Sequence, residues 1–320
     1  MNFLFWNIKG RTVNTAGAPL LDVLQQIIEA EPIDLIALAE YREYSDLLET
    51  TLVKNNKFVR LKKLSSKIEK VDVFFDPQKI EVDIAQNNEL STALRIKSKE
   101  TGISINGFFC HLPSKLFRNA DEQREYAIDY MEEVVAYEEQ MSSDKTFICG
   151  DFNMSPYEEG MVCSKGFHSI MDANVTKEYP SRTVNNKSYS TFYNPMWGLV
   201  GDLGKGEVAG SYYYKGSKSS EYFWYMFDQV ILRPSLLDYF DNSKLRVVTQ
   251  GESYNLLDDK SKINPIYSDH LPISFVLKDL VKGIQDVQEQ KDNISAENED
   301  QATEIVLPDI LKYSIGMEYL

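Results

Sequence analysis

The sequence contains little histidine and cysteine, and it has no long apolar run. Only three histidines and three cysteines occur among its 320 residues. Cys110, Cys149 and Cys163 are an odd and widely spaced set, which favours buried free thiols in a reducing compartment over a disulfide framework. No stretch approaches the roughly 18 apolar residues that a membrane-spanning helix needs. We therefore expect a cytoplasmic protein without a membrane span.

Positive charge is also scarce. The 34 Lys and Arg residues face 49 Asp and Glu residues, so the net charge is −15. This balance argues against a protein that coats nucleic acid non-specifically. It does not exclude an enzyme whose site takes its positive charge from a bound cation. One basic stretch, residues 54–70, includes Lys62 and Lys63, and it is either a solvated lysine-rich loop or a contact for a phosphate backbone.

The remaining composition suits one large mixed core. Hydrophobic residues make up 43% of the chain, which is enough for a single domain over residues 1–280. The clearest predicted helix is 120–141, where Asn119 and Glu122 form a capping box and Val134 and Val135 belong to an apolar stripe. A second helix is predicted over 19–30, with Pro19 in its first turn. Strands are predicted at 33–39, 71–75, 103–110, 146–149, 222–232 and 273–277.

The C-terminal segment differs from the rest of the chain. Residues 281–320 contain three Lys and nine acidic residues, and residues 281–303 have few apolar side chains. Such a composition predicts an acidic linker that does not bury enough surface to order itself. Residues 305–319 are more apolar, and we expect them to dock on the protein body or on a protein partner.

Polar side chains stand at the ends of six apolar runs. An Asp-Asn pair two residues apart, Asp151 and Asn153, would share one face of an extended chain, and Gly150 before it would let backbone or ligand approach. Strand ends are rigid positions for functional groups, so six of them are hard to explain as solvated surface. The residues are Asn7, Glu40, His111, Asp151 with Asn153, Asp228, and Asp269 with His270.

The order of these motifs resembles the endonuclease/exonuclease/phosphatase superfamily. The motifs are Trp-Asn-Ile-Lys-Gly, Glu40, His-Leu-Pro-Ser, Gly-Asp-Phe-Asn, Phe-Asp-Gln-Val and Ser-Asp-His, and they span residues 2 to about 278. The resemblance implies a DNase I-like α/β fold, a four-layered αββα sandwich. In that fold two mixed β-sheets pack face to face, helices lie outside, and a divalent metal binds at the sheet tops.

The resemblance implies a metal site and a separate set of catalytic groups. Mg²⁺ prefers oxygen ligands, so Asn7, Glu40 and Asp269 are its expected ligands, with Mn²⁺ able to replace it. Asp151 would orient or deprotonate the attacking water. His270 would either donate to the phosphate or act as the base, and Asp228 would support its ring.

Two further roles concern the substrate phosphate. Asn153 is expected to hydrogen-bond a phosphate oxygen, and His111 to donate to the phosphate or to protonate the leaving oxygen. In the DNase I-like branch a glutamate supports this histidine, and Glu69 has a similar position in the sequence. Lys62 and Lys63 are candidate contacts for the substrate backbone. An acidic residue stands at the position of Lys9 in the apurinic endonucleases, which argues against specificity for abasic sites.

These features predict a Mg²⁺-dependent phosphoesterase, most simply a nuclease acting on DNA or RNA. One alternative is a phosphatase or phosphodiesterase for a small or lipid phosphate, of the inositol phosphate or sphingomyelin type. Another is an inactive binding protein on the same fold, which the six polar strand ends disfavour. The aromatic segments 211–216 and 222–227 are either surfaces that stack nucleobases or strands with one buried face.

Overall fold

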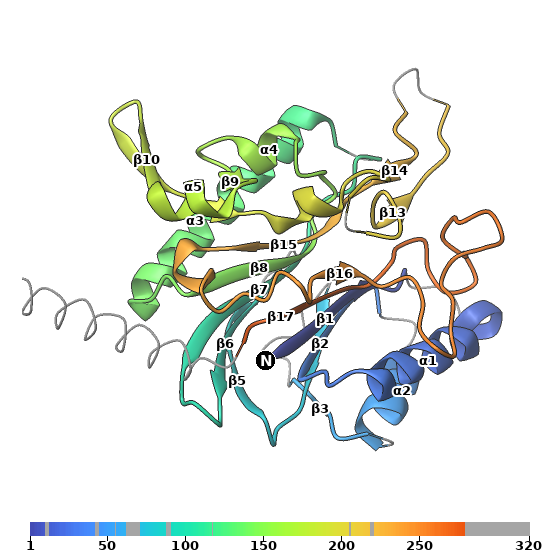
Figure 1. Cartoon of the computed structure of the whole chain (residues 1–320). Helices are drawn as coiled ribbons and strands as arrows, with labels where there is room; N and C mark the ends of the chain where they lie inside the picture. Colours follow the sequence, from blue (N-terminus) through green and yellow to red (C-terminus); the bar gives the residue numbers. More distant parts are fainter. Residues whose placement is uncertain are drawn as a thin grey trace, which may run out of the picture. The chain divides into compact units, whose positions relative to one another are not determined.

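The structure is a computed structural model, shown in Figure 1. It describes residues 1–9, 13–41, 45–54, 56–61, 71–87, 91–116, 118–204, 206–217 and 221–278. The predicted tail, Glu69, Lys62 and Lys63 lie outside these residues, as does the predicted boundary at residue 280.

The first sheet has six strands in the order β16-β17-β1-β2-β4-β3. Strands β1 and β2 run parallel, whereas the other neighbours are antiparallel, so the sheet is mixed. Every residue of β2 is buried, as expected for a central strand. The strands are β1 Asn2–Asn7, β2 Leu35–Ala39, β3 Val59–Arg60, β4 Val71–Phe75, β16 Arg246–Val247 and β17 Ile273–Val276.

The second sheet has seven strands in the order β5-β6-β7-β8-β15-β12-β9. It is also mixed, because β7 and β8 run parallel and β15 runs antiparallel to β8. Its strands are β5 Ile80–Asn87, β6 Ser91–Ser98, β7 Ser104–His111, β8 Thr146–Asp151, β9 Ser169–Ile170, β12 Phe192–Tyr193 and β15 Asp228–Leu232. Two short pairs complete the strands: β10 Ser181–Val184 with β11 Lys187–Ser190, and β13 Tyr212–Tyr213 with β14 Trp224–Tyr225.

The two large sheets pack against each other through aromatic side chains. The ring of Phe147 on β8 lies 5.1 Å from that of Phe3 on β1 and 5.3 Å from that of Phe275 on β17. Helices α1 and α3 lie on the outer sides of the two sheets (Figure 1). The helices are α1 Val13–Ala30, α2 Ser45–Leu48, η2 Glu49–Lys54, α3 Ala120–Met141, α4 Glu159–Val162, α5 Ala173–Glu178, η3 Pro195–Leu199 and η4 Pro234–Leu236. The predicted αββα arrangement of two mixed sheets with outer helices is confirmed.

Helix α3 matches its predicted bounds. The Asn119 side chain accepts a hydrogen bond from the Glu122 backbone at 3.0 Å, and the Glu122 carboxylate accepts one from the Asn119 backbone at 2.9 Å. Both bonds satisfy donors that the first turn of a helix leaves unpaired. Val134 is buried in the core between α3 and the seven-stranded sheet, but Val135 is 39% exposed, so the predicted stripe is narrower than expected.

Two predicted elements were wrong in part. Helix α1 begins at Val13, so Pro19 lies inside the helix and costs it one backbone hydrogen bond. The predicted strand 222–232 is two strands, β14 and β15, in different sheets. Aromatic and apolar residues stand on both sides of Asp228 and Gln229, and joining the two runs into one strand passed over the break that this polar pair marks. Asp228 therefore begins a strand instead of following one.

The predictions about thiols can also be compared with the structure. Cys110 and Cys149 are buried and Cys163 is half-buried, and all three are free. Burial raises the pKa of both the Cys110 and Cys149 thiols, which makes them poor nucleophiles. Among the described helices, none combines the length and the apolar character that crossing a bilayer requires.

Candidate functional site

The strand registers bring the predicted residues to one edge of the two sheets. In the seven-stranded sheet, Asp151 at the end of β8 is paired with His111 on one side and with Asp228 on the other. In the six-stranded sheet, Asn7 at the end of β1 is paired with Ala39, directly before Glu40. Because β15 and β17 are antiparallel to their neighbours, it is their first residues that reach this edge.

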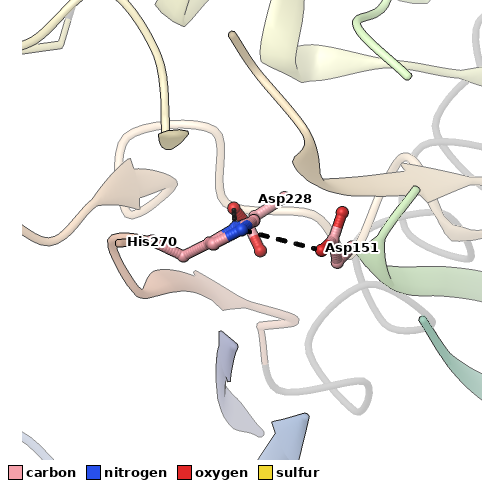
Figure 2. A group of neighbouring side chains, drawn as sticks. All are labelled: Asp151, Asp228 and His270. Atoms are coloured by element: carbon pink, nitrogen blue, oxygen red, sulfur yellow. Dashed lines mark hydrogen bonds and ion pairs between the residues drawn. The ribbon is translucent and has the colours of Figure 1, made fainter. Parts of the chain in front are cut away.

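Three buried side chains form the centre of the site. Figure 2 shows His270 between the carboxylates of Asp228 and Asp151. The His270 Nδ1 atom lies 2.8 Å from Asp228 Oδ2, and its Nε2 atom lies 3.8 Å from Asp151 Oδ2. All three residues are less than a tenth exposed. An imidazole with a carboxylate at each nitrogen is fixed in orientation and is held as a proton donor.

The surroundings alter the acidity of both central groups. Burial raises the pKa of the Asp151 carboxyl to about 7, because loss of water and the nearby Asp228 outweigh the opposite influence of His270. Burial alone would lower the pKa of His270, but Asp228 and Asp151 outweigh it and raise the pKa to about 10. Asp151 can thus change its protonation near neutral pH while His270 keeps its proton.

Backbone contacts hold His270 in place. The Trp6 indole donates to the His270 carbonyl at 2.9 Å, and the His270 N–H donates to Ser268 Oγ at 3.1 Å. The Ser268 hydroxyl in turn donates to the Asn7 carbonyl at 2.7 Å. Ser268 is fully buried, so these bonds join the loop before β17 firmly to the end of β1.

Asn7 links the central group to Glu40. Its amide donates to Asp151 Oδ2 at 3.0 Å and to Glu40 Oε1 at 3.4 Å. The His111 Nε2 atom lies 3.5 Å from the same Glu40 oxygen and 3.7 Å from Asp151 Oδ2. Glu69 was predicted to support His111 but lies outside the described residues, and within them the nearby glutamate is Glu40.

Asp269 has an unpredicted partner. The Lys9 ammonium forms an ion pair with Asp269 Oδ2, and the Lys9 side chain is 47% exposed. The Lys9 backbone has φ 35°, in the left-handed region that non-glycine residues rarely adopt, and its N–H donates to Asn7 Oδ1 at 3.0 Å. The turn after β1 therefore directs a positive charge to a predicted metal ligand.

Asp151 and Asn153 do not share a face of a strand as predicted. Strand β8 ends at Asp151, and Asn153 has φ 51°, so the chain turns between them. The Asn153 N–H donates to Asp151 Oδ1 at 2.8 Å, and its amide donates to the Leu112 carbonyl at 2.9 Å. An aspartate that accepts from the backbone two residues ahead forms an Asx turn, which replaces strand alternation here.

The close approach of strand β7 explains why residue 150 is a glycine. A Cβ atom at Gly150 would lie 2.1 Å from the Cys110 carbonyl oxygen, so only glycine fits between β7 and β8 at this point. The approaching group is thus the neighbouring strand and not a ligand.

The residues present fit a divalent cation at the Asp269 side of the site. Ligand atoms of Asp151, Asp228 and His270 lie within 4.8 Å of one another. However, the His270 nitrogens face carboxylates and hold a proton, which leaves no lone pair for a metal. The Asp269 Oδ1 atom is buried and has no hydrogen-bond partner among the described residues. An unsatisfied carboxylate oxygen suits a cation that prefers oxygen ligands, and Lys9, which pairs with Asp269 and donates its N–H to Asn7 Oδ1, connects Asp269 to the end of β1.

The sequence did not predict that several residues contact the site. Tyr212 forms a β-bridge with His270, and the two ring centroids lie 4.6 Å apart. Ser211 accepts a hydrogen bond from the Asp228 N–H at 2.9 Å. Ser268 belongs to the Ser-Asp-His motif, and Ser211 and Tyr212 belong to the aromatic segment 211–216, but no local pattern indicates the contacts of Ser211 with Asp228 or of Tyr212 with His270.

Comparisons with known proteins were made for sequence and for structure. No family model matches the chain, and no curated protein matches its sequence. Its structure does resemble solved structures. An endonuclease/exonuclease/phosphatase family protein from Bacteroides thetaiotaomicron has a TM-score of 0.55 and 12% identity, over 88% of this chain and 98% of that chain.

Two further structures have similar scores. The human Nocturnin catalytic domain with a bound sulfate anion has a TM-score of 0.54 and 14% identity, over 86% of this chain and 92% of that chain. A mannosyl-6-phosphatase from Bacteroides thetaiotaomicron has a TM-score of 0.54 and 12% identity, over 86% of this chain and 98% of that chain. Likeness at such low identity establishes the fold and leaves the substrate open. The chain has the DNase I-like fold of the endonuclease/exonuclease/phosphatase superfamily, as its sequence motifs predicted.

Proposed function

We propose that this protein is a metal-dependent phosphodiesterase, and most simply a nuclease that acts on DNA or RNA. The observation that carries the proposal is the buried group of Asp151, Asp228 and His270 beside Asn7 and Glu40. Burying two carboxylates next to an imidazole is costly for folding, so a catalytic use is the simplest reason for it.

Hydrolysis of a phosphate diester needs positive charge, a base for water and an acid for the leaving oxygen. A divalent cation, Mg²⁺ with Mn²⁺ able to replace it, would be held by Glu40, Asp269 and Asn7 and would neutralise the phosphate charge. The ammonium of Lys9 is a second positive charge at the site, paired with Asp269 and half exposed.

His270 is proposed to donate its Nε2 proton in a hydrogen bond to a phosphate oxygen. Asp228 accepts from Nδ1 at 2.8 Å, which fixes the ring and stabilises its positive charge. Asn153 is proposed to contribute a second donor. Its amide has two hydrogens, of which one binds the Leu112 carbonyl.

Asp151 is proposed as the base. It accepts a proton from the attacking water as the water oxygen bonds to phosphorus, and the bond from phosphorus to the leaving oxygen breaks. His111 lies 3.7 Å from Asp151 and is the group proposed to give a proton to the leaving oxygen. Lys62 and Lys63 remain predicted backbone contacts outside the described residues.

A substrate panel tests the proposal. The purified protein would be assayed with bis-para-nitrophenyl phosphate, para-nitrophenyl phosphate, single-stranded DNA, plasmid and RNA, each with Mg²⁺, Mn²⁺ or chelator. We expect cleavage of the diesters that depends on the metal and is lost in His270→Ala. A preference for para-nitrophenyl phosphate, the monoester, would indicate a phosphatase instead of a nuclease. A protein that binds these substrates but cleaves none of them would be a binding protein on this fold.

A further inference from the structure

A continuous row of aromatic rings leads away from His270 to the protein surface. Its consecutive ring centroids lie between 4.6 and 5.9 Å apart, which is normal contact for packed rings. We call this set the aromatic row. Its members, in order, are His270, Tyr212, Phe227, Tyr225, Tyr222 and Tyr157.

The two ends of the aromatic row differ in exposure. Phe227 is 5% exposed, so core packing accounts for it. Tyr222 is 64% exposed and Tyr157 is 38% exposed, although their centroids lie only 5.9 Å apart. Two neighbouring tyrosines that leave so much ring surface in water are not explained by the core. Their exposed faces can accept a flat apolar group.

Hydrogen bonds hold Tyr225, next to the outer end of the row. The Tyr225 hydroxyl donates to the Glu221 carboxylate and accepts from the Tyr222 N–H at 3.4 Å. Tyr225 itself belongs to β14, which pairs with β13 next to the Tyr212 bridge to His270. Tyr222 therefore packs against a ring that is already held in place, which reduces the conformational freedom lost when a ligand stacks there.

The charges around the row do not favour a phosphate backbone there. The Lys115 ammonium lies 5.4 Å from the Phe227 ring centroid, but it is already paired with the Glu158 carboxylate. Glu221 adds a second carboxylate beside Tyr225. A phosphate group would be repelled by these carboxylates, so of the parts of a nucleotide only the uncharged base suits Tyr222 and Tyr157, with its phosphates directed away from them.

We propose that Tyr222 and Tyr157 form a stacking subsite for an unpaired nucleobase of a single-stranded nucleic acid. The inference rests on the proposed function, since the row connects the subsite to the imidazole assigned to the scissile phosphate. A paired base is stacked on both faces and offers none to a protein, so the subsite selects single strands over duplex. Stacking also tolerates any base, because every base has a flat face.

The test compares two forms of one short single-stranded DNA, with normal bases and with abasic positions outside the cleaved linkage. Wild-type protein should have a KM about 5- to 100-fold lower for the form with bases, which is the scale of one stacked base. Tyr222→Ala should abolish this ratio, and Tyr222→Trp should preserve it. Tyr179→Ala is the matched control, because Tyr179 is 51% exposed and lies on another part of the surface. It should leave the ratio unchanged.

The outcomes separate the subsite from the proposed function. If Tyr222→Ala raises KM equally for both forms, or if duplex and single strand have equal KM, the stacking subsite is overturned while the phosphodiesterase stands. If no phosphodiester is cleaved with any metal, the proposed function fails, and anisotropy with the same two oligonucleotides in chelator still tests stacking. Equal affinity for both forms in that measurement would overturn the subsite as well.

Discussion

The half of the candidate site around His270 is buried and fixed, whereas the half around Asp269 is open to solvent. The side chains of His270, Asp151 and Asp228 are 8%, 2% and 0% exposed. Those of Lys9, Glu40 and Asp269 are 47%, 39% and 19% exposed. We call these the closed half and the open half.

This difference in exposure indicates different roles for the two halves in the proposed reaction. In the closed half, hydrogen bonds hold the imidazole and its carboxylates in one arrangement before any substrate binds, which avoids reorganisation during the reaction. In the open half, Glu40 and Lys9 are exposed and Asp269 is partly exposed with its Oδ1 atom buried, and Lys9 is a counter-ion that can leave. A cation that exchanges with solvent needs such access.

The largest effect is expected in the closed half. His270→Ala removes the donor proposed for the phosphate, and turnover should fall by about a hundredfold to ten-thousandfold, the scale of a lost acid–base group. Circular dichroism and thermal unfolding would verify that the variant folds. Turnover within a few-fold of wild type in a folded His270→Ala protein would end the mechanism drawn here.

The next effect should come from the open half. Glu40→Gln keeps the size of the side chain but removes a charged oxygen ligand, so Mg²⁺ affinity should fall by about ten- to hundredfold. Titration calorimetry with the metal alone measures this without a substrate. Asp144→Asn serves as the control for general loss of charge, because Asp144 precedes the first residue of β8 whereas Asp151 is at the opposite end of that strand. An unchanged Mg²⁺ affinity in Glu40→Gln would show that Glu40 is not a metal ligand and that the metal binds elsewhere.

The pH dependence of turnover should follow the ionisation of Asp151 in the closed half. Burial raises the pKa of Asp151 to about 7, and only the ionised carboxylate can accept a proton. Turnover should therefore fall about tenfold per pH unit as the pH drops below about 7, and should level off above it. The rate profile with saturating metal measures this. An acidic limb near pH ~4, where an ordinary aspartate titrates, would show that Asp151 is not the base.

The smallest effect is expected for Lys9. Lys9→Met removes the ammonium that competes with a cation for Asp269, so Mg²⁺ should bind about two- to fivefold more tightly, the scale of an exposed ion pair. Added salt should reduce the difference between the variant and wild type, because exposed charges are screened. Weaker Mg²⁺ binding in Lys9→Met would mean that Lys9 supports the open half instead of competing there.

Local signals in the sequence predicted much of the fold. The capping box at Asn119 and Glu122 fixed the start of α3, and apolar runs bounded by polar residues identified strands such as β4 and β8. Polar residues at the ends of apolar runs indicated the candidate site, because strand ends are rigid positions for functional groups. These signals act over a few residues, so a single sequence displays them.

The rest depended on contacts between distant parts of the chain. Lys9 and Asp269 are 260 positions apart, and nothing near either residue indicates the pair. The split between β14 and β15 arises because Asp228 must pair with Asp151 on β8 while Tyr225 pairs with Tyr212. The strand ends before Asn153 because the Asn153 N–H binds the nearby Asp151 side chain and not a neighbouring strand, which forms an Asx turn.

His111, Asp151 and Asp228 are paired on adjacent strands, so the hydrogen bonds between these strands determine the relative positions of the three residues. The chain between Asp151 and Asp228 could grow or shrink in exposed segments such as β10 and β11 without moving these three residues. One residue inserted within β8 would shift every side chain beyond it to the opposite face. The site is therefore insensitive to the length of its connections and highly sensitive to the number of residues in its strands.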